Sequence, residues 1–152
     1  MKKLSIAAFS ILIVSVAFFC SCSKSNYSPS NVPANTDSFP ALIISGTWKV
    51  TSMTEPGQNN TSKFSGYTFT FSNDGKIAAI SNGKSSSGTW VWSGTSYYGV
   101  NNNKPIFSIN LGNDDPTRRL SHNWVVEQKS ATAFTLGSSE PAEDEHVTFT
   151  KL

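Results

Sequence analysis

Two histidines are the side chains of this sequence best suited to acid–base catalysis or metal binding near neutral pH. His122 and His146 lie on different predicted strands, and both cysteines lie far away, at the N-terminal end. His122 has the same strand parity as Trp124 and can point inward near a strand end, whereas His146 should point outward. We expect solvated or core histidines. A carboxylate that converges on His122 at a cavity mouth would favour enzyme activity.

Two short acidic clusters are the other candidates for chemistry. Asn113-Asp114-Asp115 and Glu143-Asp144-Glu145 lack the ligand spacing and the glycine of a calcium-binding loop, and we interpret both as solvated turns. Hydrolysis by paired carboxylates needs two carboxyl groups that converge in a cleft. The sequence contains no nucleophile elbow and no glycine-rich phosphate loop. It therefore predicts no catalytic residue, no metal site and no cofactor, and we do not expect an enzyme.

The N-terminal segment has the pattern of a secretory signal. Lys2 and Lys3 form a basic start, and residues 4–20 are apolar apart from serines. This stretch is at the short limit for a membrane-spanning helix and is followed by small and polar residues, so cleavage is favoured over a permanent span.

The two cysteines, Cys20 and Cys22, lie where such a signal would be cut. The stretch Phe19-Cys20-Ser21-Cys22 resembles the lipobox of bacterial lipoproteins, in which a small residue precedes the acylated cysteine. The resemblance implies a signal peptide over residues 1–21 and a lipid, with palmitate among its acyl chains, on Cys22. An ordinary secretory signal with incidental cysteines is the alternative.

Residues 22–42 combine the acceptor cysteine with a stretch rich in serine, asparagine and proline, which predicts a flexible linker. The chain has 12 basic and 10 acidic residues, and loss of Lys2 and Lys3 with the signal would leave ten of each. A net charge near zero gives no reason to expect nucleic acid as a partner. We expect attachment to the cell envelope through the lipid. Ser23, directly after the acceptor, resembles outer-membrane sorting.

Residues 43–152 form the predicted folded domain, where apolar and polar residues alternate with period two and no segment has a helical period. Turn residues divide it into about eight strands, and Asn73-Asp74-Gly75 is a strong hairpin turn. The predicted strands cover residues 44–54, 66–72, 76–81, 87–93, 105–111, 120–128, 132–137 and 145–151. The fold class is therefore all-β, a small antiparallel up-and-down barrel, because closure covers the apolar face and protects the edges.

Three motifs resemble a known family in their order and spacing. They are Ser45-Gly46-Thr47-Trp48-Lys49-Val50, Phe69-x-Phe71-x-x-Asp74-Gly75-Lys76 and Gly88-x-Trp90. Together they look like the small lipocalin-like (calycin) domains of bacterial lipoproteins, over about residues 43–152. Lipocalins place a basic residue over the tryptophan of the first strand, and the candidates here are Lys151, Arg118 and Arg119.

Alternation assigns one set of side chains to the barrel interior. The set is Trp48, Val50, Tyr67, Phe69, Phe71, Trp90, Trp92, Phe107, Ile109, Leu111, Trp124, Val126, Phe134, Leu136, Val147 and Phe149. An eight-stranded barrel is just wide enough to be filled by side chains or to hold one small ligand.

These two uses of the interior give two hypotheses. In the first, a small apolar or aromatic molecule binds inside the barrel. Its expected contacts are Trp48, Phe69, Phe71, Trp90, Trp92, Phe107 and Trp124. In the second, the same rings fill the barrel, and the protein is a scaffold that contacts another envelope protein without a small-molecule ligand. We expect a monomer in both.

Overall fold

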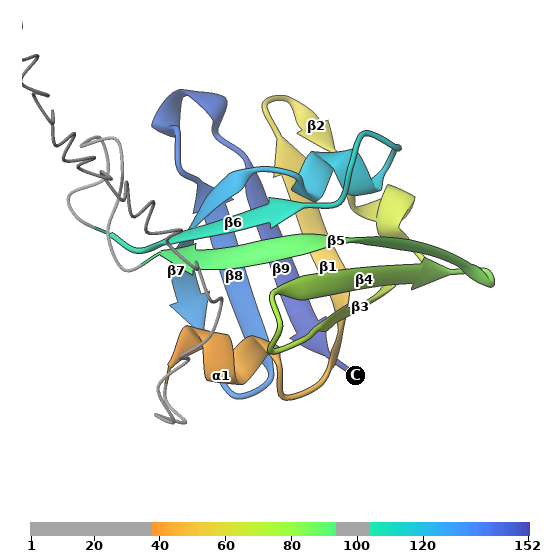
Figure 1. Cartoon of the computed structure of the whole chain (residues 1–152). Helices are drawn as coiled ribbons and strands as arrows, with labels where there is room; N and C mark the ends of the chain where they lie inside the picture. The colour runs from red at the N-terminus through yellow and green to blue at the C-terminus, as the bar shows by residue number, and fades with distance from the viewer. Residues whose placement is uncertain (1–37, 94–103) are drawn as a thin grey trace, which may run out of the picture.

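The structure is a computed structural model, and it describes residues 38–93 and 104–152. The predicted signal peptide (1–21), Cys22 and most of the predicted linker lie outside these residues. Figure 1 shows a barrel of strands with a short helix across one end. The strands of the barrel are β1 (Thr47–Glu55), β3 (Thr68–Phe71), β4 (Lys76–Ser81), β5 (Lys84–Ser93), β6 (Ile106–Asn110), β7 (Asn123–Lys129), β8 (Ala133–Ser138) and β9 (His146–Lys151).

Each strand of the barrel pairs antiparallel with its neighbours in the chain, and β9 returns to pair with β1. Val50 lies opposite Phe149 in this closing pair. The two-residue strand β2 (Gln58–Asn59) extends β1 as a hairpin and lies outside the closed ring. The predicted all-β, up-and-down barrel of eight strands is confirmed, and this architecture fits a lipocalin-like fold.

The short helix α1 (Phe39–Ile43) covers the end of the predicted linker and the first residue of the predicted domain. Ser38 caps it, because its Oγ accepts a hydrogen bond from the Ala41 N–H at 3.3 Å. Phe39 and Ile43, one helical turn apart, are both buried. Residues 39–42, which the sequence assigned to the linker, are therefore helical and pack on the barrel, and a single turn is too short to show a helical period in the sequence.

The described residues also contain three 3₁₀ turns: η1 (Thr61–Phe64), η2 (Thr117–Leu120) and η3 (Pro141–Glu143). In the described part of the chain, no helix has the length and apolarity needed to cross a bilayer.

The predicted interior set forms the core, since all but three of its members are buried and those three, Tyr67, Trp92 and Val126, are half-buried. The alternation of apolar and polar residues did not predict some of the core residues. They are Phe39, Ile43, Met53, Phe64, Ile77, Ala79, Leu120 and Val125. For Met53 the cause is visible: the register with β9 shifts between Val50 and Ser52, so Met53 turns inward where strict alternation would place Ser52.

Candidate functional site

The centre of the barrel is occupied by aromatic rings in mutual contact. Phe134 lies 4.8 Å, centroid to centroid, from both Trp48 and Phe149. Its ring is also 5.3 Å from Phe39 and 6.4 Å from Phe71. These are ordinary separations for packed aromatic pairs. Phe134 therefore connects rings from β1, β3, β9 and α1 in one cluster.

A second group of rings continues the cluster toward β5 and β6. Phe71 lies 5.9 Å from Phe107 and 6.5 Å from Trp90. Phe39 of α1 lies 5.1 Å from both Trp92 and Phe107. The structure thus brings the predicted ligand-contacting rings together, but they contact one another and the helix at the end of the barrel.

Three indole groups that were candidates for ligand contact already have partners within the protein. The N–H groups of Trp48, Trp90 and Trp124 each donate to a backbone carbonyl. The acceptors are the carbonyl oxygens of Ile43, Ser72 and Leu120, at 2.7, 3.0 and 3.0 Å respectively. Because a buried N–H needs a hydrogen-bond acceptor, these bonds account for the polar ends of the three side chains without a ligand.

Lys151 is the basic residue that lies over the tryptophan of the first strand. Its Nζ is 5.9 Å from the centre of the Trp48 ring and donates to Ser45 Oγ at 3.0 Å. A Cβ at Gly46 would lie 2.4 Å from Lys151 Cε, so the glycine of the Gly-x-Trp motif leaves room for the lysine side chain. This arrangement supplies the feature that the lipocalin resemblance implied. Arg119, another candidate, pairs instead with Glu55.

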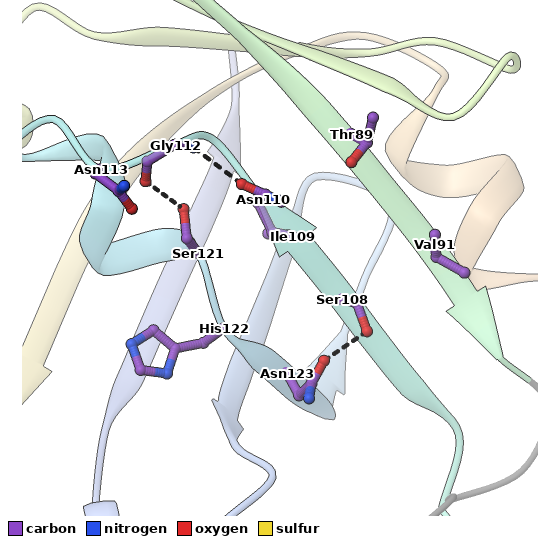
Figure 2. Close-up of a pocket in the computed structure, with 10 residues that line it drawn as sticks. All are labelled: Thr89, Val91, Ser108, Ile109, Asn110, Gly112, Asn113, Ser121, His122 and Asn123. Carbon is purple, nitrogen blue, oxygen red and sulfur yellow. Dashed lines mark hydrogen bonds between the residues drawn. The ribbon is translucent and has the colours of Figure 1, made fainter.

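A groove of about 430 Å³ lies on the outer face of β5 and β6 and the segment that leads into β7 (Figure 2). Its lining is mostly polar: Thr89, Val91, Ser108, Ile109, Asn110, Gly112, Asn113, Ser121, His122 and Asn123. Several of these groups bond to each other. Ser108 Oγ donates to Asn123 Oδ1 at 2.6 Å, and Ser121 Oγ donates to the Gly112 carbonyl at 3.1 Å.

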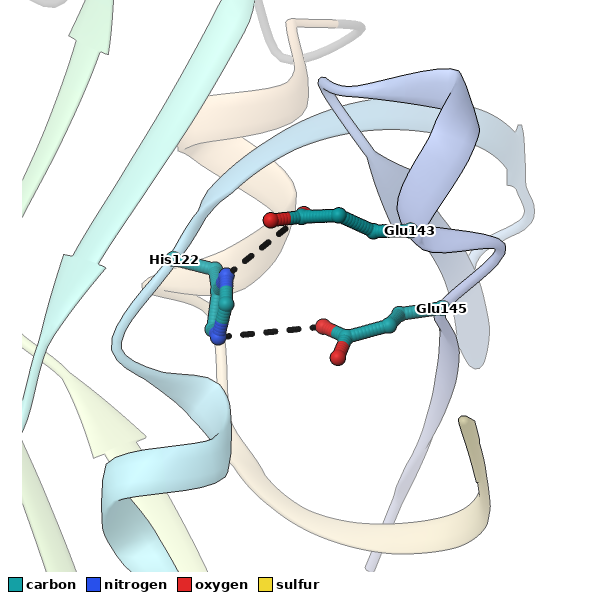
Figure 3. A group of neighbouring side chains, drawn as sticks. All are labelled: His122, Glu143 and Glu145. Carbon is teal, nitrogen blue, oxygen red and sulfur yellow. Dashed lines mark ion pairs between the residues drawn. The ribbon is translucent and has the colours of Figure 1, made fainter. Parts of the chain in front are cut away.

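His122 lies at this groove and faces the β8–β9 connection, and it does not point among the interior rings. Figure 3 shows two carboxylates approaching its ring from one side. His122 Nδ1 is 3.8 Å from Glu143 Oε2, and its Nε2 is 3.7 Å from Glu145 Oε2. The ring centroid is 5.6 Å from that of Trp124. The carboxylates of Glu143 and Glu145 therefore converge on His122.

The interpretation of Glu143-Asp144-Glu145 as a solvated turn is wrong for Glu145. Its side chain is 16% exposed, and its buried Oε2 has no hydrogen-bond partner in the described residues. Burial raises the pKa of the Glu145 carboxyl, the electrostatic interaction with His122 opposes this shift, and the charges of Glu143 and Glu55 add to it, so the net shift is upward. Asp144 adopts a left-handed conformation, φ 46°, between the two glutamates, a backbone feature that sequence reasoning did not anticipate.

His146 has its own carboxylates, and its outward orientation is confirmed. It is 43% exposed, with Nδ1 at 3.1 Å from Glu127 Oε2 and Nε2 at 3.4 Å from Asp144 Oδ1. Burial lowers the pKa of His146, but the bonds to Glu127 and Asp144 outweigh it, so the net shift of the pKa is upward. The segment from Glu143 to His146 thus contributes to two separate histidine–carboxylate groups.

Comparison with known proteins adds little information about the function of this chain. No protein-family model and no curated protein matches this sequence. Among solved structures, the chain is similar to a DUF4847 family protein from Bacteroides vulgatus. The identity is 14%, the match covers 74% of this chain and 96% of that protein, and the TM-score is 0.49. Similarity at this level carries no argument about function.

Proposed function

We propose that this chain is a lipid-anchored protein of the bacterial cell envelope whose barrel is a filled scaffold, and that its outer surface contacts another envelope protein. The observation that carries the proposal is the ring cluster around Phe134, closed at one end by Phe39 of α1. The proposal assigns the protein a binding role and no catalysis, with one chain as the working unit.

The energetics favour the filled barrel over a ligand inside it. A ligand at the centre would have to displace at least one buried ring, such as Phe134, which is 1% exposed. Removing the contacts of a buried phenylalanine costs about 3–5 kcal/mol. A ligand with a micromolar dissociation constant has only about 8 kcal/mol of binding free energy in total. Displacement of one ring would therefore consume about half of the affinity of an ordinary ligand.

A fluorescence titration separates the two hypotheses for the interior. Trp48, Trp90 and Trp124 report on the interior because all three are buried. Lipids, bile-salt-like compounds and small ring compounds are added to the full chain while tryptophan emission is recorded. The filled barrel predicts no saturable change with any of them. A saturable shift at micromolar concentration, lost when an interior ring is altered, would assign the interior to a ligand and refute the scaffold.

The proposed anchor is supported by the lipobox-like sequence that ends at Cys22. The test is fractionation of cells that produce the full chain or its Cys22→Ala variant. The unaltered chain should sediment with membranes and label with palmitate, whereas the variant should appear in the soluble fraction. Lys76→Ala, on the exposed surface of β4, serves as a control and should stay with membranes. Membrane association of Cys22→Ala would refute the anchor.

A further inference from the structure

We propose that His122, Glu143 and Glu145 form a binding site for a divalent transition-metal ion, with Zn²⁺ as the representative ion. The site would join the segment before β7 to the β8–β9 connection. It is independent of the filled barrel, because none of the three side chains belongs to the interior ring cluster.

The three side chains offer one nitrogen and two carboxylate oxygens, all within 4.8 Å of one another. Four-coordinate zinc has ligand bonds of about 2.0–2.2 Å, which places neighbouring ligand atoms roughly 3.4 Å apart. Side-chain rotations that move the ligand atoms by about 1 Å would therefore close the site around an ion. One ring nitrogen of His122 would bind the metal, and water would take the fourth position.

The spacing at His122 differs from that of an ordinary hydrogen-bonded histidine. The nitrogen–oxygen distances to Glu143 and Glu145 are 3.8 and 3.7 Å, beyond the usual hydrogen-bond range of about 2.7–3.2 Å. The two distances involve different ring nitrogens, Nδ1 and Nε2, so only one of them is a separation between two ligands of the same ion, and the other carboxylate would rotate toward the nitrogen that binds. His146, by contrast, approaches Glu127 to 3.1 Å, within direct hydrogen-bond reach.

Glu145 supplies a second and independent observation. Its Oε2 is buried and has no hydrogen-bond partner in the described residues, although it points toward His122. A buried carboxylate is costly unless it is paired or coordinates a metal, and the approach of this oxygen to His122 Nε2, at 3.7 Å, is too long for a hydrogen bond. Glu143 is already oriented, because its Oε2 accepts a short hydrogen bond from Ser138 Oγ. Such outer hydrogen bonds to a ligand are typical of metal sites.

The ligand set selects the class of ion. Two carboxylates beside a neutral imidazole carry two negative charges, which a divalent cation neutralises. Imidazole favours zinc, iron and similar ions over magnesium and calcium, and the absence of a thiolate ligand in this group disfavours copper(I). We therefore expect binding of Zn²⁺ well above that of Mg²⁺.

The test is calorimetric titration with Zn²⁺ of the full chain carrying Cys20→Ala and Cys22→Ala, so that no thiol competes for the metal. We expect one Zn²⁺ per chain and a rise in the thermal midpoint with metal concentration. His122→Asn and Glu145→Gln should each weaken Zn²⁺ binding at least tenfold. The matched control is His146→Asn, which removes the other histidine with flanking carboxylates and should change the affinity less than threefold.

Thermal unfolding without metal shows whether these variants still fold. Glu145→Gln removes a largely buried charge whose Oε2 accepts no hydrogen bond in the described residues, so its metal-free midpoint should be close to that of the parent. Glu143→Gln is the second variant, should Glu145→Gln fail to fold. Absence of Zn²⁺ binding by the parent would overturn the proposal. A loss of affinity in His146→Asn equal to that in His122→Asn would do the same.

Discussion

Replacement of Phe134 by alanine is the most direct perturbation of the filled interior. The side chain is 1% exposed and contacts the rings of Trp48, Phe149, Phe39 and Phe71. Because these rings come from separate elements, they cannot all move into the vacated space. We therefore expect a loss of about 3–5 kcal/mol in the free energy of unfolding. For a domain of this size, this corresponds to a fall in thermal midpoint on the order of 15–25 °C.

The same substitution should create a binding site that the unaltered protein lacks. An apolar cavity the size of a ring stays dry and can bind benzene. Calorimetric titration with benzene should therefore show saturable binding to Phe134→Ala and none to the unaltered chain. The thermal midpoint of the variant should also rise with benzene concentration.

Two controls make the result decisive. Val91→Ala changes an outward side chain of β5 that is 47% exposed, and it should alter the free energy of unfolding by less than about 0.5 kcal/mol. Phe134→Leu keeps most of the volume and serves if the alanine variant does not fold. Equal benzene binding by the unaltered chain and Phe134→Ala would show that the interior already has space, and would refute the reasoning.

Two further predictions concern the barrel wall and one of its loops. Gly88→Ala should lower the free energy of unfolding, measured by chemical denaturation, by about 3 kcal/mol. The reason is that the new Cβ would lie 1.8 Å from the Asn110 carbonyl oxygen across the β5–β6 pair. Ser87→Ala, at the exposed neighbouring position, is the control and should have little effect. Burial raises the pKa of the Asp115 carboxyl. The hydrogen bond from Arg119 and the positive charges of Lys63, Arg119 and Arg118 lower it by more, so the net shift of the pKa is downward. The stabilisation by this carboxylate is then complete above the pKa of the unfolded chain and disappears as the pH falls through the lower folded pKa. Thermal midpoints of Asp115→Asn and the unaltered protein should therefore differ at neutral pH and converge on acidification; a difference that persists in acid would contradict this assignment.

Most of the barrel could be predicted because the information is local. The run Thr68–Phe71 alternates aromatic and threonine side chains, and the structure buries Phe69 and Phe71 on one face of β3. Asn73-Asp74-Gly75 connects two strands that pair directly, with Phe71 opposite Ile77. In both cases, side-chain period and turn conformation are properties of a few neighbouring residues.

Local exceptions to these patterns were not predictable. The helix α1 is a single turn whose stability comes from burial of Phe39 against rings of β5, β6 and β8, and not from a repeated helical pattern. The bulge in β1 that turns Met53 inward depends on its pairing with β9. Both features arise from contacts with distant parts of the chain.

The sequence by itself determined the closed antiparallel barrel and the faces of its strands, because alternation and turn residues act over short distances. Only the tertiary structure decided which distant groups meet. Lys151 reaches Ser45 and Trp48 across more than one hundred residues, and His122 meets Glu143 and Glu145 only because β7, β8 and β9 pair in sequence. Local sequence patterns do not encode these long-range contacts, because the contacts depend on strand register and on the backbone conformation of the connections.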